Sequence, residues 1–332
     1  MKRIAVIGAG SWGTALAVVA ARAGHSVSLW SRSAEIVSSI NERRVNSRYI
    51  VSTSIPASVT ATGDLDVALR DAPMVLLAAP SHAARELLTA MSPSLDQQAI
   101  IVGVSKGIEI ETGKRVSEIA KEVVQGSHPY VCLSGPSFAK EVVERHPTAI
   151  VAASKDSAAA RMVQNDLSFE NLRIYTNADV VGTELGGSVK NVMAIAAGMA
   201  SGLGFGSNSV AALITRGLAE ITRLARREGA QVETLMGLAG LGDLVLTCTG
   251  SLSRNRFVGE ELGKGRTVDE ITAQMNEVAE GINTARAVKK LADRAGIELP
   301  ITNEVNAVLY DGKPASDTVA ELMSRPLREE IN

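Results

Sequence analysis

In the first half of the chain, short apolar runs alternate with longer amphipathic segments. The apolar runs cover residues 3–7, 27–30, 74–79, 99–105, 130–134 and 148–153. Most of them are continuous rather than alternating, which is typical of strands that helices cover on both faces. Helical periodicity occupies segments between them, such as 14–23, 82–91 and 115–124. This repetition of strand and helix predicts an α/β fold with a doubly wound parallel sheet and right-handed crossovers.

The second half of the chain has a different pattern, because strand signals end at about residue 177 and helical periodicity follows. In the predicted helix 208–228 the apolar residues share one face, and the charged residues share another face that we expect to be solvated: Arg216, Glu220, Arg223 and Arg227. Further helices are predicted over 254–262, 283–295 and 316–323. We therefore predict a sheet domain over residues 1–178 and an all-helical domain over residues 179–332, with the boundary near 176–182.

A glycine-rich turn follows the first predicted strand directly. Gly8, Gly10 and Gly13 stand in the pattern Gly-x-Gly-x-x-Gly, and a helix begins within it. In such a turn the first glycine permits the tight bend, the second lets backbone approach a pyrophosphate, and the third allows close helix–strand packing. The helix start adds N–H groups and the positive end of its dipole. We therefore expect a Rossmann-type dinucleotide site, although a glycine-rich packing turn would leave the same pattern.

The end of the second predicted strand bears on which dinucleotide binds. Sites selective for NAD usually place a carboxylate there, which binds the ribose 2′-hydroxyl. This chain has Ser31, Arg32 and Ser33 instead, and no carboxylate occurs before Glu35. A guanidinium with two hydroxyls suits a 2′-phosphate, so we expect NADP to be accepted as well as NAD. The alternative is that Arg32 is an ordinary solvated turn residue.

Composition argues against several other classes of function. The 332 residues include 34 Lys or Arg and 36 Asp or Glu, and this near balance argues against a nucleic-acid-binding protein. Cys132 and Cys248 are too few and too far apart for a disulfide framework or a Cys-rich zinc site. No spaced cluster of histidines and carboxylates suggests a metal, and no apolar run is long enough to span a bilayer. We expect a cytoplasmic protein that binds neither metal nor membrane.

Two isolated charges in the helical half carry the main chemical signal. Lys190 is the only charged residue between positions 184 and 216, and Asp243 is the only one between positions 233 and 254. Because an unpaired buried ammonium is unfavourable by several kcal/mol, we expect the two to pair. The pair is either a structural salt bridge or a proton-transfer site. In the second case desolvation and nearby cations must lower the lysine pKa toward neutrality, against the effect of the carboxylate.

Two further groups fit a ligand site. Lys106 follows the apolar run 99–105, and open α/β sheets bind ligands at the carboxyl ends of their strands. Ser253 is suited to cap the helix that starts at Arg254, and the first N–H groups of that helix would bind a phosphate. A surface lysine and an ordinary capped surface helix are the alternatives. His82 either lines the cleft or starts a helix.

The motifs of the chain resemble those of one family. GAGSWG (8–13), SKG (105–107), SGPSFAKE (134–141), LGGSVKNV (185–192), ITRGLAE (214–220), GLGDLVLTC (240–248) and SRNR (253–256) resemble the motifs of bacterial NAD(P)-dependent glycerol-3-phosphate dehydrogenase, in the same order and over nearly the whole chain. The resemblance implies interconversion of dihydroxyacetone phosphate and sn-glycerol 3-phosphate with NADP or NAD, in supply of phospholipid synthesis. It also implies a homodimer formed through the helical domain.

The resemblance assigns roles to individual residues. It makes Lys190 the proton donor in reduction, with Lys106 and Asp243 as further catalytic residues. Residues implied to bind the substrate are Lys106, Gly135, Ser137, Lys190, Asn191, Asp243, Thr247, Ser253, Arg254 and Asn255. Residues implied to bind the dinucleotide are Gly8, Gly10, Ser11, Trp12, Gly13, Arg32, Tyr49, Lys106, Ala139, Arg254, Val278 and Glu280. The chain departs from the family pattern at Ser201, where many members have Asp, and at Ala279, where Val is usual.

Two other functions fit parts of the sequence. A related two-domain dehydrogenase that acts on a 3-hydroxy acid would also take a lysine from its helical domain. Its carboxylate substrate would not need the phosphate-binding residues Ser253, Arg254 and Asn255. A nucleotide-binding redox sensor without turnover would have no reason to bury a proton donor such as Lys190.

Overall fold

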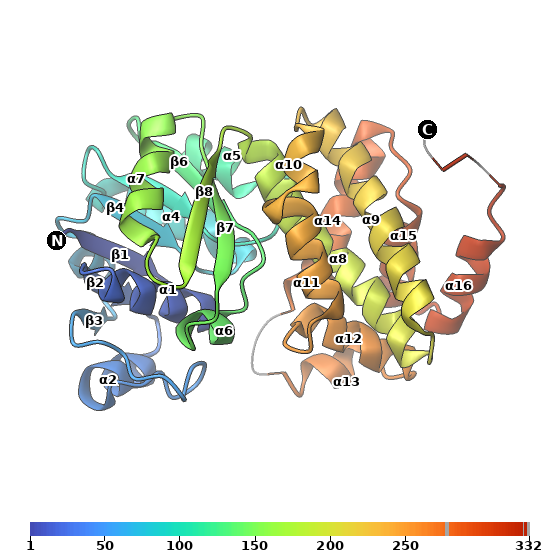
Figure 1. The fold of residues 1–332 in the computed structure, drawn as a ribbon, viewed down its shortest axis with the longest axis horizontal. Coiled ribbons are helices and arrows are strands. Elements are labelled where there is room, and N and C mark those ends of the chain that lie inside the picture. Colours follow the sequence, from blue (N-terminus) through green and yellow to red (C-terminus); the bar gives the residue numbers. More distant parts are fainter. Residues whose placement is uncertain (276–278, 328, 331–332) are drawn as a thin grey trace.

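An eight-stranded sheet forms the first half of the molecule (Figure 1). The computed structural model describes residues 1–275, 279–327 and 329–330. Its strands are β1 (Arg3–Ile7), β2 (Ser26–Trp30), β3 (Val59–Thr62), β4 (Met74–Leu77), β5 (Ile100–Gly103), β6 (Tyr130–Ser134), β7 (Thr148–Ala153) and β8 (Leu172–Asn177), in the order β3-β2-β1-β4-β5-β6-β7-β8. All six predicted strands are present, and the predicted doubly wound α/β class is confirmed.

Two edge strands and one strand direction differ from the prediction. β3 and β8 were not predicted because their residues alternate between buried and exposed positions, as edge strands do, and give no continuous apolar run. β7 runs antiparallel to β6, whereas every other neighbouring pair is parallel. An apolar run indicates that helices cover both faces of a strand, but it does not fix the direction of the strand.

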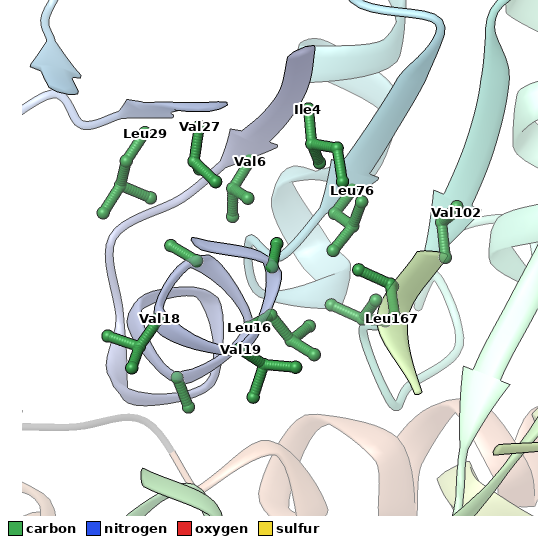
Figure 2. Close-up of a cluster of buried hydrophobic side chains, with 14 of the residues drawn as sticks. Ile4, Val6, Leu16, Val18, Val19, Val27, Leu29, Leu76, Val102 and Leu167 are labelled. Atoms are coloured by element: carbon green, nitrogen blue, oxygen red, sulfur yellow. The ribbon is translucent and has the colours of Figure 1, made fainter. Parts of the chain in front are cut away.

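Helices cover both faces of the sheet and divide its core in two. α1 (Ser11–Arg22), α2 (Ala34–Arg43), α6 (Ala139–Val143) and α7 (Ser157–Leu167) pack on one face, and α3 (Leu65–Leu69), α4 (Ala84–Met91) and α5 (Val116–Val123) pack on the other. Along β1, Ile4 and Val6 join the first core and Ala5 and Ile7 join the second, as the two-residue period of a strand requires. Figure 2 shows Ile4 and Val6 above α1 in the first core. The packing fixes α1 directly behind the glycine turn.

The second half of the molecule consists of helices around one buried central helix (Figure 1). They are α8 (Val180–Gly202), α9 (Ser207–Arg227), α10 (Val232–Met236), α11 (Asp243–Thr249), α12 (Arg254–Gly263), α13 (Val268–Thr272), α14 (Glu280–Ala295), α15 (Pro300–Tyr310) and α16 (Ala315–Met323), with a π-helical turn at Leu238–Gly242. α8 is buried along nearly its whole length and contacts α9, α11, α12, α14 and α15. Among the described residues, no helix combines the length and apolar character that crossing a bilayer requires.

Glycines bring the backbones of α8 and α12 into direct contact. A Cβ atom added at Gly198 of α8 would lie 2.1 Å from the carbonyl oxygen of Arg256, and one at Gly259 of α12 would lie 2.0 Å from that of Ile195. Neither position has room for a side chain, because these distances are far below van der Waals contact. The close packing holds the start of α12 beside the middle of α8, where Lys190 lies.

The predicted solvated face of the helix 208–228 is wrong at one position. Glu220 is only 3% exposed, and its carboxylate accepts hydrogen bonds from the backbone N–H groups of Ile301 (2.6 Å) and Thr302 (3.3 Å) at the start of α15. A carboxylate there satisfies N–H groups that have no partner within their own helix. Charge periodicity within one helix does not show that the end of another helix packs against it.

A second buried carboxylate joins the two halves of the molecule. Glu184, in the second turn of α8, accepts hydrogen bonds from the backbone N–H of Ser117 (2.8 Å), the Ser117 hydroxyl (2.5 Å) and the Tyr130 hydroxyl (3.0 Å). Arg115 lies 3.3 Å from it as an ion-pair partner. Burial raises the pKa of Glu184, and these donors act in the opposite direction. The contacts fix α8 against α5 and β6, and thereby fix Lys190 relative to the sheet.

Candidate active site

A cleft of about 600 Å³ lies at the carboxyl ends of the central strands. Its walls come from the loops after β1, β2, β4, β5 and β6 on one side and from α8, α11, α12 and α14 on the other. The order of strands reverses between β1 and β4, and open α/β sheets bind ligands at such a switch point. The position of the cleft therefore agrees with the position predicted for a ligand.

The three glycines of the first turn have the geometry that a dinucleotide loop requires. Gly8 has φ +117°, a conformation that residues with side chains rarely adopt, and a Cβ there would lie 2.8 Å from the Ala78 carbonyl oxygen. A Cβ at Gly13 would lie 1.9 Å from the Gly8 carbonyl oxygen. Gly10 instead faces open space, with no atom within 4 Å of its Cβ position, so a ligand can approach the backbone there.

The residues around this turn fit a bound NAD(P). No side chain caps α1, so the start of the helix can present N–H groups to a pyrophosphate. Trp12 lines the cleft, and its buried indole N–H has no hydrogen-bond partner within the described part of the chain. Because a buried donor nearly always finds a partner, this orphaned group is suited to a ligand atom. The donor set and the open face of Gly10 both match a dinucleotide.

The loop after β2 lines the same cleft with polar side chains. Ser31, Arg32 and Ser33 are among its lining residues, and the Ser31 hydroxyl accepts a hydrogen bond from the Ser33 backbone N–H (3.2 Å). Ser33 in turn caps α2 through its hydroxyl, which accepts from the Ile36 N–H (3.3 Å). Arg32 is exposed at the cleft. The guanidinium of Arg32 and the hydroxyls of Ser31 and Ser33 therefore lie together in the loop at the end of β2, as predicted.

Three elements converge on one buried carboxylate at the opposite part of the cleft. Asp243 of α11 is 1% exposed and forms ion pairs with both Lys190 of α8 and Lys106 from the loop after β5. Lys106 Nζ lies 2.6 Å from Asp243 Oδ2 and also donates to the Gly135 carbonyl oxygen at 3.0 Å. Lys190 Nζ donates to Asp243 Oδ1 and, at 2.7 Å, to Thr247 Oγ1. The predicted pairing of Lys190 with Asp243 is confirmed, and Lys106 shares the same carboxylate.

Burial lowers the pKa of Lys190 to about 7, from an ordinary value of 10.5. Loss of solvent is the largest cause, and the neighbouring ammonium of Lys106 acts in the same direction. Asp243 opposes both, since a nearby anion favours the charged lysine. Both Lys190 and Lys106 line the cleft, so an amine that gains and loses a proton near neutral pH faces the ligand space. This arrangement is suited to general acid–base chemistry.

The start of α12 forms the remaining wall of the cleft. Ser253 caps the helix by accepting a hydrogen bond from the Arg256 N–H (3.2 Å), as predicted, and Ser253, Arg254 and Asn255 all line the cleft. Asn255 Oδ1 accepts from the Gly281 N–H (2.9 Å) at the start of α14, which fixes the two helix ends together. A phosphate placed here would meet a helix N-terminus and a guanidinium in the same cleft as Lys190.

Glu280, the first residue of α14, also lines the cleft. Its carboxylate accepts hydrogen bonds from the backbone N–H of Ser81 (2.9 Å) and from the backbone of Lys106. Burial raises the pKa of Glu280, while these donors and the nearby cations lower it. Glu280 therefore ties the loops after β4 and β5 to the helical half at the centre of the cleft.

The structure places most of the predicted site residues on the cleft wall, with four exceptions. Gly13 packs behind the turn, Ala139 packs against the sheet core, Gly135 contributes its carbonyl oxygen to Lys106, and Asp243 is buried behind the two lysines with which it forms ion pairs. The predicted residues that do line the cleft are Gly8, Gly10, Ser11, Trp12, Arg32, Tyr49, Lys106, Ser137, Lys190, Asn191, Thr247, Ser253, Arg254, Asn255 and Glu280. Val278 lies outside the described residues. His82 both starts a helical turn and lines the cleft.

Sequence reasoning missed several residues of the wall. Arg48, Ser105, Phe138 and Leu252 line the cleft without having been predicted. Ser105 follows β5 directly and donates a hydrogen bond to the Ala79 carbonyl oxygen, so its position after a strand was the available signal. Arg48 and Leu252 lie in irregular segments, where no periodicity indicates which side chains face a ligand.

Two family models together match most of the chain. The N-terminal part of NAD-dependent glycerol-3-phosphate dehydrogenase matches residues 3–160, and the C-terminal part matches residues 179–320. The chain belongs to the NAD-dependent glycerol-3-phosphate dehydrogenase family. The predictions of the family and of an NAD(P)-dependent oxidoreductase are confirmed.

Individual members of this dehydrogenase family resemble the chain over its full length. The glycerol-3-phosphate dehydrogenase [NAD(P)+] of Koribacter versatilis (strain Ellin345) is 54% identical over 100% of this chain and 99% of the relative. That of Geobacter sp. (strain M21) is 50% identical over 99% of both. The crystal structure of glycerol-3-phosphate dehydrogenase from Coxiella burnetii superposes with a TM-score of 0.94 at 41% identity, covering 98% of this chain and 99% of that one.

The shared carboxylate predicts how one lysine controls the other. Lys106→Met removes a cation that disfavours a second charge and leaves Asp243 to Lys190 alone, so the pKa of Lys190 should rise. The measurement is a pH titration of the lysine side-chain amines by NMR. Lys155→Met, which removes an exposed lysine outside the cleft, is the matched control and should leave the titration unchanged. A Lys190 pKa that is the same in both variants would contradict the coupling.

Proposed function

We propose that this chain interconverts dihydroxyacetone phosphate and sn-glycerol 3-phosphate with NADPH or NADH, and so supplies glycerol 3-phosphate for phospholipid synthesis. The observation that carries the proposal is the buried amine of Lys190, with a pKa near 7, in the same cleft as the glycine turn and the start of α12. These three features provide a proton donor, a dinucleotide site and a phosphate site. Membership of the family supports the choice of substrate.

The residues that would hold the dinucleotide lie along one side of the cleft. The backbone of Gly8–Gly10 and the start of α1 would bind its pyrophosphate, and Arg32 with Ser31 and Ser33 would bind its adenosine end. When bound, the nicotinamide supplies or accepts a hydride. Glu280 keeps the loops after β4 and β5 in place at the centre of the cleft, through its bonds to Ser81 and Lys106.

Lys190 would act as the acid in the reductive direction. Its ammonium would donate a hydrogen bond to the substrate carbonyl oxygen, stabilise the negative charge that develops there and deliver the proton to it. Asp243 and Thr247 hold the amine in position from behind. Because burial has already lowered the pKa of the amine, the proton leaves it readily near neutral pH. In the oxidative direction the neutral amine would take the proton back from the hydroxyl.

The substrate phosphate would bind at the start of α12. Ser253, Arg254 and Asn255 line that part of the cleft, and Asn191 lies next to Lys190 on α8. Binding of this remote group would align the reacting carbon with Lys190, so that binding energy is used for orientation. A non-phosphorylated ketone would lack this contact, and so would a 3-hydroxy acid.

Three further expectations belong to the proposal. The division into a dinucleotide-binding domain, residues 1–178, and a catalytic helical domain, residues 179–332, is supported by the change from strands to helices between β8 and α8. The homodimer through the helical domain rests on the family resemblance. The cytoplasmic location stays a prediction from the sequence.

The activity itself is tested by following the absorbance of NADPH. The purified chain should oxidise NADPH with dihydroxyacetone phosphate and should be much slower with dihydroxyacetone, which lacks only the phosphate. Equal rates with the two ketones would contradict a phosphate site at α12. No oxidation with either ketone would overturn the proposed function.

Lys190→Met should abolish proton delivery while it keeps a side chain of similar length. We expect kcat to fall by about 100-fold or more, the range attributed to general acid catalysis. NADPH affinity, measured by fluorescence titration without substrate, should change little, because Asp243 keeps Lys106 as its partner. A variant with wild-type kcat would exclude Lys190 as the acid.

A further inference from the structure

A turn that the sequence analysis did not single out is fixed to the dinucleotide loop. Asn46, in the segment between α2 and β3, is fully buried, and its side-chain amide donates to the Ala9 carbonyl oxygen (2.9 Å) and to Thr14 Oγ1 (2.8 Å). Its oxygen accepts from the backbone N–H groups of Arg48 and Tyr49, both at 3.3 Å. One buried amide therefore joins the glycine loop to the turn that carries Arg48.

The geometry of this turn directs Arg48 into the cleft. Arg48 and Tyr49 both line the cleft with Trp12 and Arg32. Tyr49 packs against the sheet core, and the Arg48 guanidinium lies over its ring, 5.6 Å from the centroid. The ring is held by packing, and the backbone of the turn is held by Asn46. The exposed guanidinium of Arg48 is thus positioned both by the Tyr49 ring and by the backbone that Asn46 holds.

The charges around this turn favour an anion. Within the described part of the chain, neither Arg32 nor Arg48 forms an ion pair with a carboxylate. Glu280 is the only Asp or Glu among the lining residues described, and it is committed to Ser81 and Lys106. Two guanidiniums and two serine hydroxyls without a carboxylate match a phosphate better than a ribose hydroxyl.

The pyrophosphate already has a site at the start of α1, so it does not account for a second guanidinium. The 2′-phosphate of NADP(H) does, because it adds close to two negative charges at the adenosine end, where one arginine leaves the charge partly uncompensated. We propose that Arg48, together with Arg32, binds the 2′-phosphate of NADP(H), and that Asn46 is the positioning residue that holds Arg48 there. The proposal rests on the dinucleotide site of the proposed function, and it adds a specificity-determining residue to that site.

The test measures binding alone, with two ligands that differ only in the 2′-phosphate: adenosine 2′,5′-bisphosphate and adenosine 5′-monophosphate. Trp12 and Trp30, the two tryptophans of the chain, both line the cleft, so their fluorescence can report occupancy. Calorimetry provides an independent readout. The quantity of interest is the ratio of the two dissociation constants. It does not depend on turnover, so it separates failure of this proposal from failure of the proposed reductase activity.

Arg48→Ala should weaken the bisphosphate by about 10-fold or more and leave the monophosphate within about 2-fold, as expected for loss of one charge-assisted contact. Arg48→Lys should keep part of the discrimination, because charge remains while the planar fork is lost. Arg32→Ala should resemble Arg48→Ala. Arg43→Ala is the matched control, since it removes the same charge from an exposed residue at the end of α2 that does not line the cleft.

The outcomes for Arg48 are decisive in both directions. Equal weakening of both ligands would place Arg48 on a group that they share and would overturn the proposal. An Arg48→Ala variant that discriminates like the wild type and like Arg43→Ala would also overturn it. A wild-type chain that does not distinguish the two ligands would refute the 2′-phosphate site even if dihydroxyacetone phosphate is reduced.

Asn46→Asp tests the positioning role separately. It replaces the amide donor by a carboxylate next to the Ala9 carbonyl oxygen, so the turn should shift away from the loop. If Asn46 positions Arg48, Asn46→Asp should reduce the preference for the bisphosphate, measured as the ratio of the two dissociation constants. Adding Asn46→Asp to Arg48→Ala should then cause no further loss of this preference. A purely structural role predicts an unchanged ratio with a lower melting temperature. Thr14→Val removes only the second partner of Asn46 and provides a milder variant if Asn46→Asp does not fold.

Discussion

The structure depends on one buried anion, the carboxylate of Asp243, which holds two ammonium groups from different parts of the chain. Lys190 comes from the central helix of the helical half, and Lys106 comes from the loop that follows the central strand β5. Burial lowers the pKa of Lys190 to about 7, and the neighbouring ammonium of Lys106 acts in the same direction, whereas the carboxylate of Asp243 favours the charged lysine. The ion pair that connects the two halves of the molecule therefore contains an amine that can release its proton near neutral pH.

The backbones of α8 and α12 approach each other unusually closely. Glycines at the contact of α8 with α12 leave no room for side chains between the two backbones. The start of α12 therefore packs directly against the middle of α8, where Lys190 lies. Glu184 fixes the other end of α8 on the sheet through Ser117 and Tyr130. The glycine turn, Lys190 and the start of α12 are thus held by rigid elements, as preorganised catalysis requires.

The sequence predicted those features that depend on local pattern. Continuous apolar runs located six of the strands, the glycine spacing located the tight turn between β1 and α1, and the isolation of Lys190 and Asp243 in apolar segments indicated their pairing. Lys106 was expected at a strand end, but its place on the same carboxylate depends on a contact across 137 residues. The hydrophobic pattern around Lys106 contains no information about a partner as distant in the sequence as Asp243.

The failures have the same physical origin. Glu220 lies on the charged side of its helix, yet it binds N–H groups of a helix that starts about 80 residues later. Asn46 lies in an irregular segment, and the atoms that give it a role belong to a loop 37 residues before it. Edge strands such as β3 alternate between buried and exposed residues and are too short to give a clear period. Each error concerns long-range contacts or weak local pattern, and none concerns the composition of the core.

The most direct test of the account is the pH dependence of the reductive half of the reaction. The rate constant for reduction of dihydroxyacetone phosphate in a single turnover, with NADPH saturating at every pH, should be highest at acidic pH and fall as pH rises through about 7, where Lys190 loses its proton. The oxidative rate should rise over the same range. A reductive rate that stays constant far into the alkaline range would show that Lys190 keeps its proton, and would contradict the role given to this buried amine as an acid whose pKa lies near neutrality.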